Sequence, residues 1–272
     1  KKVIYLNNVI FAFLITLLAG LSTGIGSCIA FFAKKTNTKF LSISLGFSAG
    51  VMIYVSMIEI FPKAQDALTK SMGEKLGSWS TVIAFFIGMA IIAVIDKLIP
   101  QEENPHEIKK MENIEEKNIK KNKSLLRTGI FTAMAIAIHN FPEGLATFIS
   151  ALDDVTIAIP IAIAIAIHNI PEGISVSVPV YYATGDKKKA FYYSFLSGMS
   201  EPLGAIIGYV LLRNFLNDIT LGIVFAIVGG IMVFISLDEL LPSAREYGEH
   251  HLSIYGLIAG MGVMAISLLL FK

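Results

Sequence analysis

The sequence has few of the residues that a disulfide-rich protein or a nucleic-acid-binding protein needs. Its one cysteine, Cys28, excludes a framework of disulfide bonds within the chain. Only 16% of the residues are charged, the net charge is +1 and no long basic tract stands out, so we expect no nucleic acid as a partner. The HExxH spacing of zinc proteases is also absent. These absences leave the apolar residues as the main evidence of fold.

Apolar residues make up 54% of the chain, and its mean hydropathy of +0.68 is too high for an ordinary soluble domain. A helix needs about 20 apolar residues to cross a lipid bilayer, and eight segments are about that long. We therefore expect an all-α polytopic membrane protein with eight transmembrane helices. The segments cover residues 6–33, 40–64, 77–99, 125–150, 155–182, 188–213, 218–242 and 252–271.

The stretch between the third and fourth segments consists mostly of charged and amide residues, so we expect a solvated tether there. Lysine and arginine favour the cytoplasmic side of a membrane. Fifteen of the 22 lie in loops on the side of this tether, and seven lie on the other side. We therefore expect a multi-pass protein of the cell (inner) membrane with both termini outside. We expect a single domain with four parts: helices 1–3 (1–99), the cytoplasmic linker (100–127), the central helices 4–5 (128–182) and helices 6–8 (183–272).

Two internal repeats relate distant parts of the chain. The sequence AIAIHNFPEG at 135–144 recurs 29 residues later as AIAIHNIPEG at 164–173. A second pair, GVMIYVSMIEIFPKA at 50–64 and GIMVFISLDELLPSA at 230–244, matches at an offset of 180. The members of each pair lie on helices that run in opposite directions. The pattern predicts a 3+2+3 inverted repeat, an architecture in which secondary transporters bind substrate near the middle of the membrane.

Each copy of the shorter repeat places a histidine, an asparagine and a glutamate in an apolar run. The histidine and glutamate are four residues apart and share one helix face, and the proline between them leaves one backbone carbonyl without its helical bond. Imidazole and carboxylate ligands suit Zn²⁺, Fe²⁺, Mn²⁺ or Co²⁺. Such groups can instead serve only to hold helices together, but buried carboxylates are costly, which favours function. The candidate metal ligands are His139, Asn140, Glu143, His168, Asn169 and Glu172, with Glu201 beside Ser200 on the sixth helix.

The longer repeat places acids at equivalent positions, Glu59 on the second helix and Asp238 and Glu239 on the seventh. They lie near the predicted C-terminal ends of those helices, which suits the entrance and the exit of an ion path. The alternative for each acid is an interfacial side chain without a transport role. His250 and His251, in the predicted last cytoplasmic loop, either capture metal on release or are simply solvated.

Three functions are compatible with these residues. The first is a transporter of divalent cations that works by alternating access; the others are an intramembrane metallohydrolase and a metal-selective channel. The near-identical ligand sets suit ion binding better than an asymmetric acid–base site, so we expect a transporter and no enzyme. The small residues Gly20, Gly24, Gly204 and Gly208 allow close helix packing within one chain or between two, which leaves a homodimer open.

The eight segments, the charged linker and the two HNxPEG motifs together resemble the ZIP (Zrt/Irt-like) family of divalent-metal transporters, in particular its bacterial ZupT-like branch. The resemblance covers nearly the whole chain. It implies import of Zn²⁺, and of Fe²⁺, Mn²⁺, Co²⁺ and Cd²⁺ as related ions, by an elevator-like movement and without a resident cofactor.

The resemblance also implies a site for two metals between helices four, five and six. One metal would be held by the two histidines and two glutamates, and the second by the two asparagines and Glu201, with Glu143 and Glu172 bridging. The chain departs from many relatives in the long loop, where it has only His106 instead of a histidine-rich stretch. It also carries His168 and Asn169 where some relatives have other polar residues.

Overall fold

The computed structural model describes residues 6–32, 38–98, 118–153, 155–212, 217–247 and 250–270. Within these ranges the chain is helical apart from short turns, and no strand occurs. A helix satisfies every backbone group within its own segment, as a chain in hydrocarbon requires. The helices are α1 (Leu6–Phe32), α2 (Thr38–Val55), η1 (Ser56–Ile60), α3 (Phe61–Met72), α4 (Glu74–Leu98), α5 (Asn118–Asp153), α6 (Val155–Thr184), α7 (Lys187–Gly198), α8 (Ser200–Leu212), α9 (Asp218–Ile235), η3 (Ser236–Leu240), α10 (Leu241–Tyr247) and α11 (His250–Leu270).

Each of the eight predicted segments lies on one helical run. The second and seventh runs join three pieces each, α2–η1–α3 and α9–η3–α10, and the sixth is broken at Met199 into α7 and α8. The prediction of an all-α polytopic membrane protein is confirmed. In the described part of the chain, five runs are long and apolar enough to cross a membrane: Asn7–Cys28, Ser42–Met72, Glu74–Ile95, Asp218–Leu240 and His251–Leu269.

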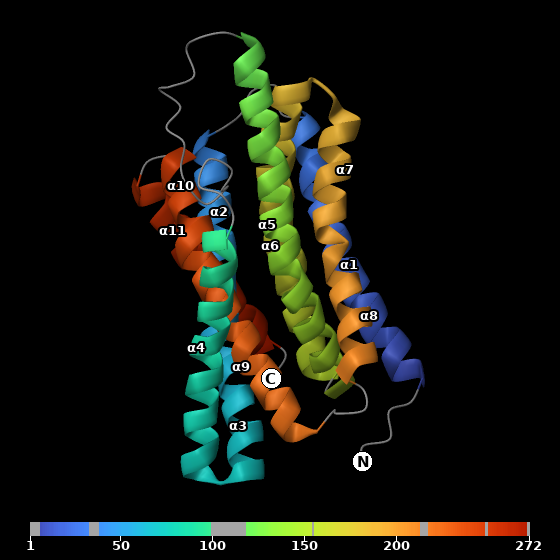
Figure 1. Ribbon diagram of the computed structural model, residues 1–272, viewed down its shortest axis with the longest axis vertical. Helices are drawn as coiled ribbons and strands as arrows, with labels where there is room; N and C mark the ends of the chain where they lie inside the picture. The colour runs from blue at the N-terminus through green and yellow to red at the C-terminus, as the bar shows by residue number, and fades with distance from the viewer. Residues whose placement is uncertain are drawn as a thin grey trace.

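The helices form two groups that lie side by side (Figure 1). The first, here called the α2/α9 group, contains α2, α3, α4, α9, α10 and α11. The second, the α5/α6 group, contains α1, α5, α6, α7 and α8. The groups meet mainly where α2 faces α6 and where α9 faces α5.

Glycines bring helix backbones together inside the α2/α9 group. A Cβ added to Gly50 of α2 would collide with the carbonyl oxygen of Leu257 on α11. A Cβ added to Gly230 of α9 would collide in the same way with that of Phe85 on α4. The longer repeat aligns these two glycines. The two halves of this group are therefore packed by the same kind of contact, a glycine against the backbone carbonyl of a neighbouring helix.

The α5/α6 group is packed in the same manner. Gly20 of α1 and Gly198 of α7 lie against each other, because a Cβ on either one would meet the carbonyl oxygen of the other. Gly24 faces Phe195, while Gly204 and Gly208 face α5. All four glycines considered for a homodimer, Gly20, Gly24, Gly204 and Gly208, therefore lie in contacts within the chain.

Two π-helical turns interrupt the second and seventh runs at equivalent positions. They are η1 and η3, and each comes just before a proline, Pro62 or Pro242. In η1 the N–H of Phe61 donates to the carbonyl of Ser56, five residues earlier, and in η3 Leu241 donates to Ser236. The proline ring presses on the carbonyl four residues before it, and a widened turn makes room for the ring.

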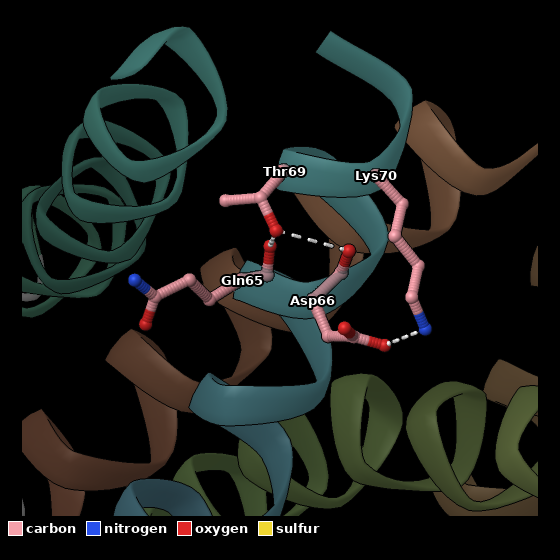
Figure 2. A network of polar contacts seen from close by, with 4 residues as sticks. All are labelled: Gln65, Asp66, Thr69 and Lys70. Carbon is pink, nitrogen blue, oxygen red and sulfur yellow. Dashed lines mark hydrogen bonds and ion pairs between the residues drawn. The ribbon is translucent and has the colours of Figure 1, made fainter. Parts of the chain in front are cut away.

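Two helix boundaries differ from the prediction. The second run continues past residue 64 to Met72, where the positive φ of Gly73 ends it. Figure 2 shows polar contacts within α3: Thr69 Oγ1 donates to the carbonyl of Gln65 at 2.8 Å, and Lys70 pairs with Asp66 at 2.5 Å. In addition, α5 begins at Asn118, so the predicted tether of 100–127 is partly helical, as its lysines and leucines favour. Residues 99–117, with His106, lie outside the described part.

Candidate metal-transport site

Five of the seven predicted ligands have described side chains, and all five are buried. Asn140 and Glu143 lie on α5, Asn169 and Glu172 on α6, and Glu201 on α8. None is more than 1% exposed. A carboxylate is rarely buried this fully in a protein unless it is paired or holds a cation.

Close approach of the helix backbones places α8 against α5 at the level of the site. A Cβ on Gly144 would collide with the backbone of Glu201, so α5 and α8 touch one residue after Glu143. Pro142 lies inside α5, which continues through it to Asp153. The glycine of the HNFPEG motif is therefore the contact point that lets the glutamate before it lie near α8.

Asn169 orients its amide towards two acceptors. Its Nδ2 donates to the carbonyl oxygen of Ala19 on α1 at 3.0 Å and also to Oε1 of Glu201. Both amide hydrogens are thus used, and Oδ1 is buried with no hydrogen-bond partner among the described residues. The side chain has a free oxygen acceptor, which is the atom that a cation binds.

Asn140 is held in a similar way from another helix. Its Nδ2 lies 3.4 Å from the carbonyl oxygen of Ser197 on α7, and its Oδ1 is buried with no hydrogen-bond partner in the described part. The two asparagines of the repeated motif therefore use their nitrogen on a backbone carbonyl and leave their oxygen available. The repeat in sequence corresponds to a repeat in hydrogen bonding.

The carboxylates are held by partners from neighbouring helices. Glu201 Oε1 accepts from Asn169, while its Oε2 is buried and, among described residues, has no hydrogen-bond partner. Glu172 Oε1 accepts from the hydroxyl of Ser48 on α2 at 3.2 Å. A buried, unsatisfied carboxylate oxygen is costly, and a bound divalent cation would offset that cost.

The histidine ligands stay a prediction. His139 and His168 occur in the helical parts of α5 and α6, but their side chains lie outside the described part. Among the side chains that are described, no group of three or more His, Cys, Asp or Glu residues could by itself hold a metal ion. The described part of the site consists of buried carboxylate and amide oxygens.

The acids of the longer repeat lie within the π turns. Glu59 is half-buried in η1, whereas in η3 Asp238 is exposed and Glu239 is buried. We expected them near the ends of their helical runs; instead the runs continue to Met72 and Tyr247. Their role in an ion path stays a prediction.

The predicted last loop is shorter than expected. The helix α11 begins at His250, so His250 and His251 lie in its first turn. The ring of His251 lies against that of Tyr255, with 6.2 Å between centroids. A role of His250 and His251 in metal release stays a prediction.

The sequence did not single out two kinds of group in the site. Ser48 is one of many serines in apolar helices, and only its position opposite α6 distinguishes it. The carbonyl oxygens of Ala19 and Ser197 carry no sequence signal, because every residue has such an oxygen.

Comparison with known proteins adds to this geometry. Residues 96–268 match the family model described as ZIP zinc transporter. The chain is 72% identical to the zinc transporter ZupT of Clostridium perfringens, over 98% of both chains. It is 70% identical to that of Streptococcus mutans, over 96% of this chain and 97% of the relative. It is 63% identical to the zinc transporter ZupT of Oceanobacillus iheyensis, over 97% of this chain and 99% of the relative.

Proposed function

The chain belongs to the ZIP family of zinc transporters, and on this premise we propose that it imports Zn²⁺ into the cytoplasm. Membership of this family makes it a transporter rather than an enzyme. The observation that carries the proposal for this chain is the set of five buried carboxylate and amide side chains contributed by α5, α6 and α8. Carboxylate and amide oxygens can replace the water that a divalent cation loses on entering the membrane.

We assign the ligands as the repeated motif suggests. His139, His168, Glu143 and Glu172 would hold one ion, since imidazole and carboxylate are common Zn²⁺ ligands. The asparagines and Glu201 would hold a second ion through oxygen alone, and oxygen ligands also suit Mn²⁺. Fe²⁺, Co²⁺ and Cd²⁺ would compete at the first position.

We propose that the chain is a 3+2+3 inverted repeat of eight spans. Three observations support this assignment. They are the equivalent backbone contacts of Gly50 and Gly230, the two π turns at equivalent positions, and the contacts of a further pair of glycines on α4 and α11. A Cβ on Gly88 would collide with the carbonyl oxygen of Ile227, and one on Gly260 with that of Phe47. Ile227 and Phe47 differ by the same 180 positions as the longer repeat.

We propose that transport works by alternating access, with the two helix groups sliding past each other. Every glycine in the described part whose added Cβ would overlap a neighbouring helix backbone has its partner within its own group. Each group is therefore tightly packed inside, while the surface between them consists of side chains. An interface of that kind can shift without separating interlocked backbones.

Exposed aromatic residues support the membrane placement. Trp79 near the start of α4, and Tyr192 and Tyr255 on α7 and α11, are all largely exposed. The start of α4 lies at one end of the helix bundle, and the starts of α7 and α11 lie towards the other (Figure 1); aromatic belts of membrane proteins lie at both membrane surfaces. We propose that the end with the Gly185–Asp186 turn is cytoplasmic in the inner membrane, since three lysines follow that turn.

The test is uptake of Zn²⁺ into proteoliposomes by the wild type, Glu143→Ala and Glu172→Ala. We expect saturable uptake by the wild type and at least a tenfold loss in both variants. Glu74→Ala is the control, because this exposed acid begins α4 away from the site and should transport normally. Wild-type uptake by both site variants would contradict the proposal, and uptake that never saturates would indicate a channel. Repeating the assay with Mn²⁺, Fe²⁺, Co²⁺ and Cd²⁺ would define selectivity.

A further inference from the structure

A hydrogen bond joins the two helix groups at the candidate site. Ser48 of α2 donates through Oγ to Oε1 of Glu172 on α6, at 3.2 Å. Both side chains are 0% exposed, so water does not compete with this bond. The donor belongs to the α2/α9 group and the acceptor to the α5/α6 group.

The inverted repeat does not reproduce this contact. At the offset of 180, Ser48 corresponds to Val228 of α9, and Glu172 corresponds to Glu143 at the offset of 29. Val228 is 2% exposed and part of the apolar core. A valine side chain has no hydrogen-bond donor, so α9 has no hydroxyl at the position equivalent to Ser48. The two glutamates of the repeated motif therefore differ in what the α2/α9 group offers them.

We propose that Ser48 is a positioning residue for Glu172, an inference that rests on the proposed transport function. The hydroxyl holds Oε1 of the carboxylate on the α2 side and so directs the remaining oxygen to the transported ion. Ser48 itself does not bind the ion. Because its partner lies on the other group, the bond ties the orientation of a metal ligand to the relative position of the two groups.

The expected effect is on apparent affinity for the ion. Loss of one hydrogen bond to a carboxylate should raise the KM for Zn²⁺ in Ser48→Ala by roughly three- to tenfold. The maximal rate should not fall, because the ligands themselves stay in place. Ser48→Thr keeps the hydroxyl and should restore a KM close to that of the wild type.

Ser42→Ala is the matched control. Ser42 is a buried serine on the same helix, and its Oγ donates to the carbonyl oxygen of Ala244 at 2.5 Å. That bond stays within the α2/α9 group, away from the site. This variant loses a similar bond and should keep the wild-type KM.

A cycle of variants tests whether Ser48 acts through Glu172, with Zn²⁺ binding to the purified protein measured by calorimetry. Ser48→Ala should weaken binding in the wild-type background and have no further effect in a Glu172→Ala background, where the acceptor oxygen is gone. Equal effects in both backgrounds would overturn the proposal, as would a wild-type KM in Ser48→Ala. A KM raised equally in Ser42→Ala would also overturn it, since the effect would then be one of helix packing. Failure of the transport proposal is distinguishable, because Glu172→Ala would then take up Zn²⁺ like the wild type.

Discussion

Adding one methyl group at Gly144 should disturb both the fold and the site. In Gly144→Ala the new Cβ would collide with the carbonyl oxygen of Glu201. It would also lie only 2.5 Å from the Cα and the carbonyl carbon of that residue, which is 0.9 Å short of the 3.4 Å at which ordinary contact begins. The obstacle is backbone and cannot rotate away. Helices α5 and α8 must therefore separate by at least about that distance, which moves Glu201 away from Glu143.

The size of the effect follows from that displacement. Overpacking of a close contact costs about 1–3 kcal/mol, and each kcal/mol lowers the Tm of a chain of this size by roughly 2–4 °C. We therefore expect a Tm lower by roughly 2–12 °C in thermal unfolding of the detergent-solubilised protein. A displacement of about 1 Å in a ligand set can cost up to about 100-fold in rate, so Zn²⁺ uptake in proteoliposomes should fall by at least about tenfold.

Gly262→Ala is the control for this prediction. Its added Cβ on α11 would have nothing within 4 Å. The same substitution there should leave uptake unchanged and raise stability by up to about 1 kcal/mol, because alanine favours a helix more than glycine does. If Gly144→Ala unfolds at the wild-type temperature and transports at the wild-type rate, the inferred contact between α5 and α8 is wrong.

Four further substitutions test other parts of the structure by thermal unfolding and Zn²⁺ uptake. Asp186→Ala removes the N-cap of α7, which accepts two backbone N–H groups, and should cost about 0.5–2 kcal/mol with transport retained; an unchanged Tm would contradict the capping role. Lys70→Ala breaks only the exposed pair with Asp66 and should leave the Tm unchanged. Gly50→Ala and Gly230→Ala should lower the Tm by similar amounts, since the added Cβ collides with a backbone carbonyl in both. A lower Tm in only one of the two variants would argue against the inverted repeat.

The sequence predicted the positions of the helical runs well because a lipid bilayer restricts the backbone structures that a chain can adopt inside it. Backbone groups in hydrocarbon must be satisfied within the protein, and a helix satisfies them within its own segment, so apolar length alone locates the runs. The sequence predicted burial equally well: Asn140, Glu143, Asn169 and Glu172 of the repeated motif are all inside the protein, and so is Glu201. An ionisable residue in a lipid-crossing helix has to turn inwards, because the lipid-facing side cannot accommodate it.

The sequence did not predict where the helical runs end or where they widen. The segment α3 carries polar residues such as Asp66 and Lys70 on its exposed side, so hydropathy places the end of the run too early. The π turns leave no signal in periodicity, since each shifts the helix face by a single residue. Their position becomes understandable only from the prolines that follow them, Pro62 and Pro242.

Nor could the sequence predict which groups meet. Gly144 and Gly173 occupy equivalent places in the repeated motif, but Gly144 lies against Glu201 on α8 and Gly173 lies against Thr23 on α1. Thr23 and Glu201 are thus equivalent in packing, although one is a hydroxyl and the other a carboxylate. On the proposed inverted repeat, two helix positions related by inversion therefore carry different chemistry. On the proposed alternating-access mechanism, a symmetric backbone would let the site face either side of the membrane, while Glu201 and Ser48, each present in one half only, would make the two directions of opening chemically unequal.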